Sequence, residues 1–140
     1  MPTLAHRIAP VHLRVGVDLV AVDRVGRLVT NHAGAEERLF TAKERAYCRG
    51  KRRFHEHLAA RVAAKEAVGK ALGTGIGAGL PWKAVEVLLE SSGRPYILLH
   101  GEARQWGERH GLVELDVSLS HTDELAVAYV VALVSAPPGT

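Results

Sequence analysis

Two carboxylates, Asp18 and Glu66, stand where a charge is costly unless it has a partner. Asp18 interrupts the apolar run 15–20, and Glu66 lies in the alanine-rich segment 54–72. A hard cation such as Mg²⁺ takes one or two protein carboxylates and completes its octahedron with phosphate oxygens and water. The pair is therefore the first candidate for a magnesium site. From the pattern alone, two other roles stay open. Asp18 could cap a turn, and Glu66 could form an ordinary i, i+4 surface pair with Lys70, worth about 0.3–0.5 kcal/mol.

His121 and a glycine-rich connection are further candidates. His121 follows an alternating segment and could donate to a phosphate or transfer a proton, although a histidine that ends a strand can equally be structural. The glycines of segment 73–79 follow a predicted helix and do not open one after a strand, so neither a dinucleotide-binding site nor a P-loop fits their context. Such a loop could still let a ligand approach the backbone closely. Neither Ser118 nor Ser120 lies in a nucleophile elbow, and the sequence shows no catalytic triad.

A short strand and a long helix would position the two carboxylates. Residues 15–20 alternate in type, which predicts a strand with Asp18 on the face opposite its Val/Leu residues. The segment 54–72 is rich in alanine and leucine and is followed by Gly73, which predicts a helix that ends at a glycine C-cap. Because this helix has two apolar stripes, we expect it to be packed on more than one side.

Charged residues occupy the gaps between those two stripes. At about 100° per residue, Glu66 and Lys70 lie one turn apart in the same gap. Arg61 and Lys65 share the other gap. We expect both pairs to be only partly solvated.

Further elements are predicted around the long helix. Thr41 and Glu44 fit a capping box at the start of a helix of about two turns. Other helices are predicted at 21–31 and 101–111, and strands at 84–90, 96–99, 115–121 and 125–134. This order predicts an α+β fold, a single domain whose mainly antiparallel sheet packs around the long central helix. The domain is expected to span 13–135, between a loose leader at 1–12 and a frayed tail at 136–140.

The composition favours a soluble protein with an anionic partner. A chain of 140 residues that is 47% hydrophobic can build a core, and its single cysteine, Cys48, excludes an internal disulfide framework and indicates a reducing cytoplasm. No apolar run reaches membrane-spanning length, so we expect no contact with a membrane. The net charge of +3 favours an anionic partner. The basic cluster 49–53 is not interleaved with base-stacking aromatics, which argues against nucleic acid without excluding it.

Five segments resemble, in order, the motifs of the bacterial holo-acyl-carrier-protein synthases, which are short 4′-phosphopantetheinyl transferases. They are VGVDLVAVDRV at 15–25, RLFTAKE at 38–44, AARVAAKEAVGKALGTGIG at 59–77, GRPY at 93–96 and VSLSHT at 117–122. The resemblance implies an enzyme that transfers the phosphopantetheine arm of coenzyme A to a serine of an acyl carrier protein and releases adenosine 3′,5′-bisphosphate.

The resemblance also implies roles for individual residues. Asp18 and Glu66 match the ligands of the Mg²⁺ cofactor, and Lys70 would neutralise charge that develops on the phosphate. Whether Glu66 or a water on the metal is the base for the carrier serine stays open. Arg53 and Arg61 are candidates for the 3′-phosphate, because guanidinium groups bind phosphate in a bidentate fork. The positions that match the coenzyme A site are Arg53, Arg61, Lys70, Gly73, His121 and Thr122.

Arg24 matches an arginine that contacts the acidic carrier protein. Related enzymes carry further arginines where this chain has Asn31 and Gly34, and Arg27 could substitute for one of them. Position 20 is valine where the larger, two-lobed transferases have another carboxylate, so the resemblance implies the short type, a homotrimer with active sites between subunits. Whether the carrier serves fatty-acid, polyketide or peptide synthesis stays open. Two alternatives remain, an inactive coenzyme A-binding module of the same fold and a basic nucleic-acid-binding domain.

Overall fold

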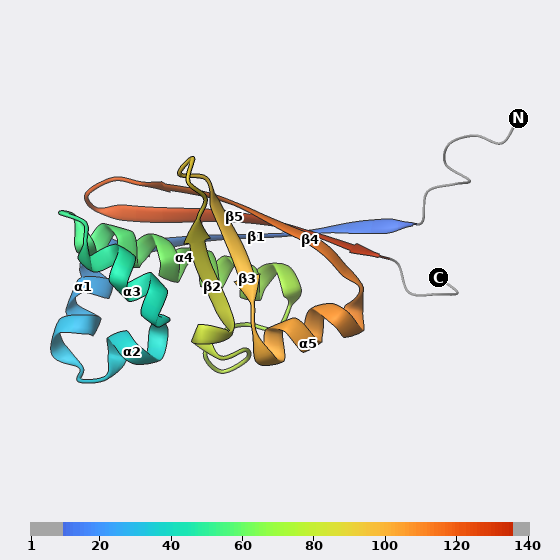
Figure 1. Ribbon diagram of the computed structural model, residues 1–140, viewed down its shortest axis with the longest axis horizontal. Coiled ribbons are helices and arrows are strands. Elements are labelled where there is room, and N and C mark those ends of the chain that lie inside the picture. Colours follow the sequence, from blue (N-terminus) through green and yellow to red (C-terminus); the bar gives the residue numbers. More distant parts are fainter. Residues whose placement is uncertain (1–9, 136–140) are drawn as a thin grey trace, which may run out of the picture.

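A three-stranded antiparallel sheet covered by one long helix forms the centre of the protein, as a computed structural model of residues 10–135 shows (Figure 1). The strands are β1 (Val11–Ala21), β5 (Leu125–Ser135) and β4 (Leu112–His121), in the order β1-β5-β4. This confirms the predicted α+β fold. The leader and tail expectations for residues 1–9 and 136–140 lie outside the described residues. The leader was expected to reach residue 12, which is wrong, because Val11 and His12 already pair with β5.

Strand β1 alternates as predicted, and its side chains point in two very different directions. Gly16 and Val20 are buried beneath the long helix, and Asp18 lies with them on this inner face. Val15, Val17 and Leu19 point to the other face and are 51–61% exposed. The apolar set of β1 therefore lies outside the core, and the small or polar set lies inside it.

The long helix, α4 (Phe54–Leu72), ends as predicted at Gly73, which adopts the left-handed conformation with φ of 76°. Its fully or almost fully buried alanines let it approach the sheet closely. At Gly16 the contact is so tight that an added Cβ would lie 2.0 Å from the carbonyl oxygen of Ala67. Glycine is therefore required at position 16 by the space between strand and helix.

Three shorter helices precede α4, namely α1 (Val22–Asn31), α2 (Ala35–Leu39) and α3 (Ala42–Arg49). The capping box at the start of α3 is confirmed. The amide of Glu44 donates to Thr41 Oγ1 at 3.2 Å, and the amide of Thr41 donates to Glu44 Oε1 at 2.8 Å. The five-residue α2 was not predicted.

Glu44 also belongs to a buried ion pair. Lys65 Nζ lies 2.9 Å from Glu44 Oε1 and donates to the carbonyls of Trp82 and Val85, while Glu44 Oε2 accepts from the amide of Val87 at 2.9 Å. Both side chains are 0% exposed. The expectation that Arg61 and Lys65 are partly solvated is therefore wrong. Carbonyls and a carboxylate replace the water around Lys65, and Arg61 is only 3% exposed. Burial lowers the pKa of Lys65, and the charge of Glu44 opposes that shift.

A hairpin and a helix complete the fold. The short helix η2 (Trp82–Ala84) leads into β2 (Val85–Leu89) and β3 (Pro95–Leu99), which pair in the predicted antiparallel hairpin, and α5 (Gly101–His110) follows. The guanidinium of Arg94, beside the hairpin turn, donates to both carboxylate oxygens of Asp116 on β4, each at 2.9 Å. Within the described residues, no helix is long and apolar enough to cross a membrane.

The contact at Gly16 leads to a stability prediction. In Gly16→Ala the new methyl group meets the backbone of α4, so helix and strand must separate, and we expect a loss of about 1–3 kcal/mol in the free energy of unfolding. Urea denaturation followed by circular dichroism measures it.

Gly50→Ala is the matched control. An added Cβ there makes only an ordinary contact of 3.5 Å, and φ is −76°, so stability should stay the same or rise slightly. Equal stability of Gly16→Ala and Gly50→Ala would show that the contact between α4 and β1 is looser than described.

Candidate functional site

Asp18, Glu66 and Lys70 come together where β1 passes under the C-terminal half of α4. Lys70 Nζ donates to Asp18 Oδ1 at 3.0 Å and to the carbonyl oxygen of Val17 at 3.1 Å. Among the described residues, the salt bridge of Lys70 is to Asp18 and not to Glu66. The interpretation of Glu66 and Lys70 as an ordinary surface pair is therefore wrong. We call Asp18, Glu66 and Lys70 the carboxylate cluster.

The carboxylate cluster concentrates negative charge in a partly dry place. The Asp18 side chain is 11% exposed, and its Oδ2 is buried without a hydrogen-bond partner within the described residues. Burial raises the pKa of Glu66 to about 7. The nearby carboxylate of Asp18 acts in the same direction, and the charges of Arg24 and Lys70 oppose it. At neutral pH the two neighbouring carboxylates, Asp18 and Glu66, therefore carry more negative charge than the nearby cations offset.

These two carboxylates fit a divalent metal ion bound mainly by oxygen. Within the described residues, Asp18 Oδ2 is a buried acceptor without a partner, and the raised pKa of Glu66 shows that its negative charge lacks compensation, which a bound cation would supply. No group of three or more His, Cys, Asp or Glu able to hold a metal occurs in residues 10–135. A metal held here would need further oxygen ligands from water or a substrate, which suits Mg²⁺ with phosphate.

A second candidate region surrounds Arg61, on the side of α4 that faces α3. A cavity of about 180 Å³ is bounded by Tyr47, His57, Arg61 and His121, and no carboxylate lines it; its other walls are Ala60, Leu89, Gly93, Pro95 and Leu119. The Arg61 guanidinium lies 4.6 Å from the ring centre of Tyr47. Its Nε is buried without a hydrogen-bond partner among the described residues. We call this region the basic cavity.

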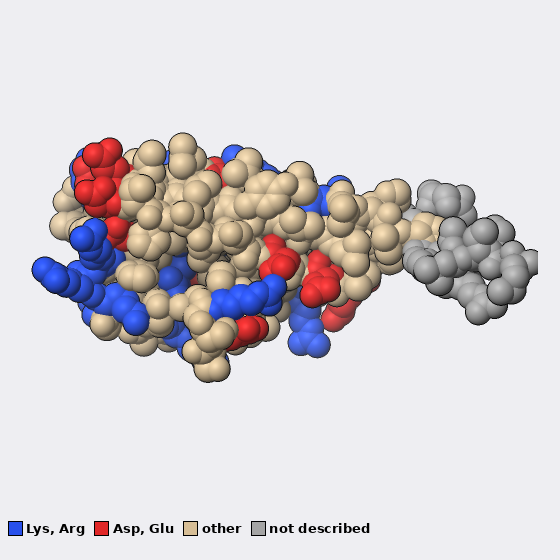
Figure 2. Space-filling view, turned by 90° about the horizontal axis from the view of Figure 1, so that it is seen from above, with Lys and Arg blue, Asp and Glu red and all other residues tan. Residues whose placement is uncertain are grey.

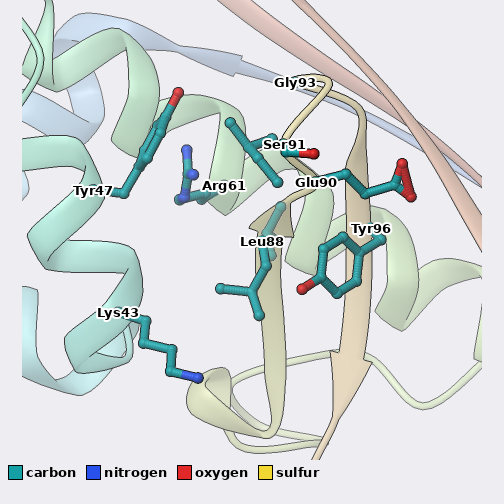
Figure 3. Close-up of a pocket in the computed structure, with 10 residues that line it drawn as sticks. Lys43, Tyr47, Arg61, Leu88, Glu90, Ser91, Gly93 and Tyr96 are labelled. Atoms are coloured by element: carbon teal, nitrogen blue, oxygen red, sulfur yellow. The ribbon is translucent and has the colours of Figure 1, made fainter.

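The basic cavity continues into a larger groove of about 500 Å³ between α3 and the β2–β3 hairpin (Figure 3). Tyr47 and Arg61 face the hairpin turn near Ser91 and Gly93, and Lys43 extends toward the groove from α3 (Figure 3). The walls combine the cations Lys43 and Arg61, the rings of Tyr47 and Tyr96, apolar strand residues and one carboxylate, Glu90. Such a groove suits a flat ring that carries phosphate groups.

Sequence reasoning missed Tyr47 and His57. His57 lies one helical turn before Arg61, so the spacing already put both on one face of α4. No sequence signal linked Tyr47 to them, because α3 meets α4 only through tertiary packing.

The other predicted coenzyme A-binding residues lie in different surroundings. Arg53 is largely exposed and pairs with Glu56 at 3.4 Å, and Glu56 also lies 3.4 Å from His121 Nδ1. The Thr122 hydroxyl accepts from the amides of Glu124 and Leu125, at 3.2 and 3.1 Å, so it shapes the β4–β5 turn. Gly73 is at the opposite end of α4 from the basic cavity.

Arg24 and Arg27 are exposed on α1. Arg24 is near enough to the carboxylate cluster for its charge to lower the pKa of Glu66. Lys and Arg side chains gather at the end of the molecule that holds α1 and α3 (Figures 1 and 2). This end offers a positive surface next to the carboxylates.

The carboxylate cluster and the basic cavity lie on different sides of α4. Arg61 and Glu66 are five residues apart, which turns their side chains by about 140° around the helix axis. Asp18 and Leu119 both flank Ala128, so two strand spacings, about 10 Å, separate them across the sheet. The carboxylate cluster and the basic cavity therefore open on different sides of α4. One chain therefore presents two half-sites that face apart.

Comparison with known proteins adds to this geometry. The model of the 4′-phosphopantetheinyl transferase superfamily matches residues 14–131. The holo-[acyl-carrier-protein] synthase of Geobacter sulfurreducens is 44% identical over 117 residues, which are 83% of this chain and 93% of that protein. The protein of the same name from Moorella thermoacetica is 44% identical over 122 residues, which are 87% of this chain and 93% of that protein.

Solved structures agree. A holo-(acyl-carrier-protein) synthase from Bacillus anthracis in complex with CoA (3′,5′-ADP) is 32% identical with a TM-score of 0.70, covering 88% of this chain and 96% of that one. The synthase from Neisseria meningitidis is 29% identical with a TM-score of 0.78, covering 85% and 96%. The chain therefore belongs to the 4′-phosphopantetheinyl transferase superfamily and, within it, to the holo-[acyl-carrier-protein] synthases.

Proposed function

We propose that this protein transfers the 4′-phosphopantetheine group from coenzyme A to a serine of an apo acyl carrier protein. The observation that carries the proposal is the carboxylate cluster, in which a buried oxygen of Asp18 without a partner lies beside a Glu66 whose pKa is raised to about 7. It occurs in a chain of the synthase family, and one similar structure contains coenzyme A.

In the proposed reaction, the serine oxygen attacks the phosphorus that carries the pantetheine arm. A new phosphate ester bond forms to the serine, and the bond to the second phosphate of the pyrophosphate breaks. Adenosine 3′,5′-bisphosphate leaves with the electron pair of that bond. The serine proton must pass to a base, and Glu66, with a pKa near neutral, suits this task as well as water does.

Lys70 and the carboxylates would orient the pyrophosphate. Lys70 Nζ, fixed by Asp18 and the carbonyl of Val17, presents its remaining donor capacity to a phosphate oxygen. We propose Mg²⁺ as the cofactor, held by Asp18 and Glu66. When bound, it would offset the negative charge that moves onto the leaving phosphate.

The basic cavity is the proposed anchor for the nucleotide end of coenzyme A. Arg61, with its unpartnered Nε, and His121 would hold the 3′-phosphate, and Arg53 lies at the outer rim beside Glu56. Thr122 supports His121 through the turn that its hydroxyl stabilises.

We propose that the protein is a homotrimer whose active sites lie between subunits. One chain leaves the carboxylate cluster and the basic cavity facing apart, so a neighbouring chain would bring the second half-site to the first. The outer face of the sheet supports this proposal, because it is a largely uncharged surface (Figure 2). Its exposed apolar residues are Val11, Leu13, Val15, Val17, Leu19, Leu125 and Tyr129. Contiguous apolar surface of this kind is typical of protein interfaces.

The acidic carrier is proposed to dock on α1 through Arg24 and Arg27, which lie next to the carboxylate cluster and would place the carrier serine near it.

A reducing, cytoplasmic compartment is proposed as well. Cys48 is buried and burial raises the pKa of its thiol to about 11, so it has neither a disulfide partner in the described chain nor nucleophilic character.

Glu66→Gln tests the reaction. With Mg²⁺, coenzyme A and apo carrier proteins of fatty-acid, polyketide and peptide synthesis, mass spectrometry should show carriers that gain one phosphopantetheine group. Glu66→Gln keeps the shape of the side chain but removes its charge, and the rate should fall at least ~10²-fold.

Glu102→Gln, on the exposed face of α5, is the control and should react at the unmodified rate. A protein that binds coenzyme A but modifies none of these carriers would be a binding module, and the proposed function would be wrong.

A mixing experiment tests the shared site. Glu66→Gln and Arg61→Met should each be nearly inactive. Joint refolding of the two should restore activity at about a quarter of the sites, where the intact Glu66 of one chain meets the intact Arg61 of another. His121→Ala serves as a second cavity variant in case Arg61→Met folds poorly. If both residues act within one chain, no mixture recovers activity.

Arg27→Glu tests the carrier surface. The reversed charge would repel an acidic carrier, so the KM for the carrier should rise about tenfold while the KM for coenzyme A stays constant. Steady-state rates at two salt concentrations measure both, and added salt should reduce the difference. Arg104→Glu on the exposed part of α5 is the control. An equal rise in KM for both arginine variants would rule out α1 as the docking surface.

A further inference from the structure

His57 lines the basic cavity, but the proposed function gives it no role. It lies on α4 one turn before Arg61 and is half-buried. Its ring makes edge-to-face contacts with Tyr47, at 5.8 Å between ring centres, and with His121, at 5.7 Å. Its ring nitrogens make no hydrogen bond to another residue of the described chain, which leaves them available to a ligand.

The surroundings of His57 carry an excess of positive charge. From α4 it faces Arg61 and, on the other side, Glu56, while β4 contributes His121. Lys51 lies just before α4, and its Nζ is 4.7 Å from the ring centre of Tyr47, the residue that α3 contributes. Among the described residues, Glu56 is the carboxylate that acts on His57, and its oxygens already lie within 3.4 Å of His121 and Arg53. Glu90, at the hairpin, lines the adjoining groove with Tyr47 and Arg61.

These surroundings disfavour the imidazolium form of His57. Burial lowers the pKa of His57, the charges of Arg61, His121 and Lys51 lower it further, and Glu56 opposes them. A bound dianion opposes the effect of the neighbouring cations, because it neutralises their charge and attracts a proton to the ring. The cavity of about 180 Å³, at ~30 Å³ for each water molecule, has room for a phosphate group with some of its water.

We propose that His57 is a specificity residue that recognises the 3′-phosphate of coenzyme A as an imidazolium ion, taking up a proton when that phosphate enters the basic cavity. This inference rests on the proposed function. A phosphate monoester carries nearly two negative charges at neutral pH, and a charged donor binds it more strongly than a neutral one. The preference for coenzyme A over 3′-dephospho-coenzyme A should therefore be larger at low pH than at high pH.

Calorimetric titration tests this with a matched pair of ligands. Coenzyme A and 3′-dephospho-coenzyme A share the same pyrophosphate, so the carboxylate cluster contributes equally to both, and only the 3′-phosphate differs. Each is titrated into the full-length protein at constant Mg²⁺, at about pH 6 and about pH 8, on either side of the ordinary pKa of histidine. Two buffers of different protonation enthalpy give the number of protons bound with the ligand.

The unmodified protein should take up more protons with coenzyme A than with the dephospho ligand, by up to about one. In His57→Phe, which keeps an aromatic ring between Tyr47 and His121, this excess should largely disappear. The preference for coenzyme A should fall about tenfold at pH 6 and change little at pH 8. His57→Gln, which keeps a neutral donor, should likewise lose the excess proton and the pH dependence. It also keeps the test valid if the phenylalanine variant is unstable.

His32→Gln, exposed at the end of α1 and away from the cavity, is the control and should behave as the unmodified protein. If His57→Phe and His57→Gln bind coenzyme A with the same preference and the same proton uptake as the control, this inference is wrong and the proposed function stands. If the unmodified protein binds neither ligand, the proposed function itself is wrong, and the inference fails with it.

Discussion

At Gly16, helix α4 lies against β1 with no side chain between the two backbones. This contact sets the distance between a strand and a helix that are far apart in sequence. Asp18 is two residues further along the strand on the same inner face, and Glu66 is next to Ala67, the helix residue that Gly16 touches. The carboxylate cluster can therefore form only while this contact holds. The buried alanines of α4 serve the same purpose, because a larger side chain would lift the helix from the sheet.

On the opposite side of α4, polar contacts add to the apolar ones. Lys65 and Glu44 form a buried ion pair whose remaining hydrogen-bonding groups reach the backbone of η2 and β2. Breaking such a pair typically costs about 3–5 kcal/mol, because it leaves a charge without water or a partner. Glu44 also completes the cap of α3, so the pair fixes α3 and the hairpin relative to α4. Tyr47 and Arg61, which face each other across that junction, are positioned by it.

The two sides of α4 explain why one chain is an incomplete enzyme under the proposed function. The proposed metal ligands and the proposed anchor for a nucleotide phosphate face apart, and β1 and β5 expose further apolar side chains on the outer face of the sheet. In the proposed trimer, a neighbouring copy would cover the exposed apolar face and would also supply the missing half-site. The chemistry of the carboxylates and the burial of the sheet are then parts of one assembly.

The sequence by itself determined the features that depend on near neighbours. Alternation in β1, the capping box of Thr41 and the glycine end of α4 follow from contacts within a few residues, and all three were predicted correctly. Family motifs identified Asp18 and Glu66 as a pair, although periodicity alone left them as a turn cap and a surface ion pair. Only the tertiary structure decided which face of β1 is buried, that Lys65 is dry, and that Lys70 binds a carboxylate 52 residues away instead of its helix neighbour. It also brought Tyr47 and His121 to Arg61 and His57. These outcomes depend on how closely α4 packs against the sheet and α3. That packing is set by the volumes of side chains that are far apart in the sequence, and local sequence patterns do not encode how such side chains fit together.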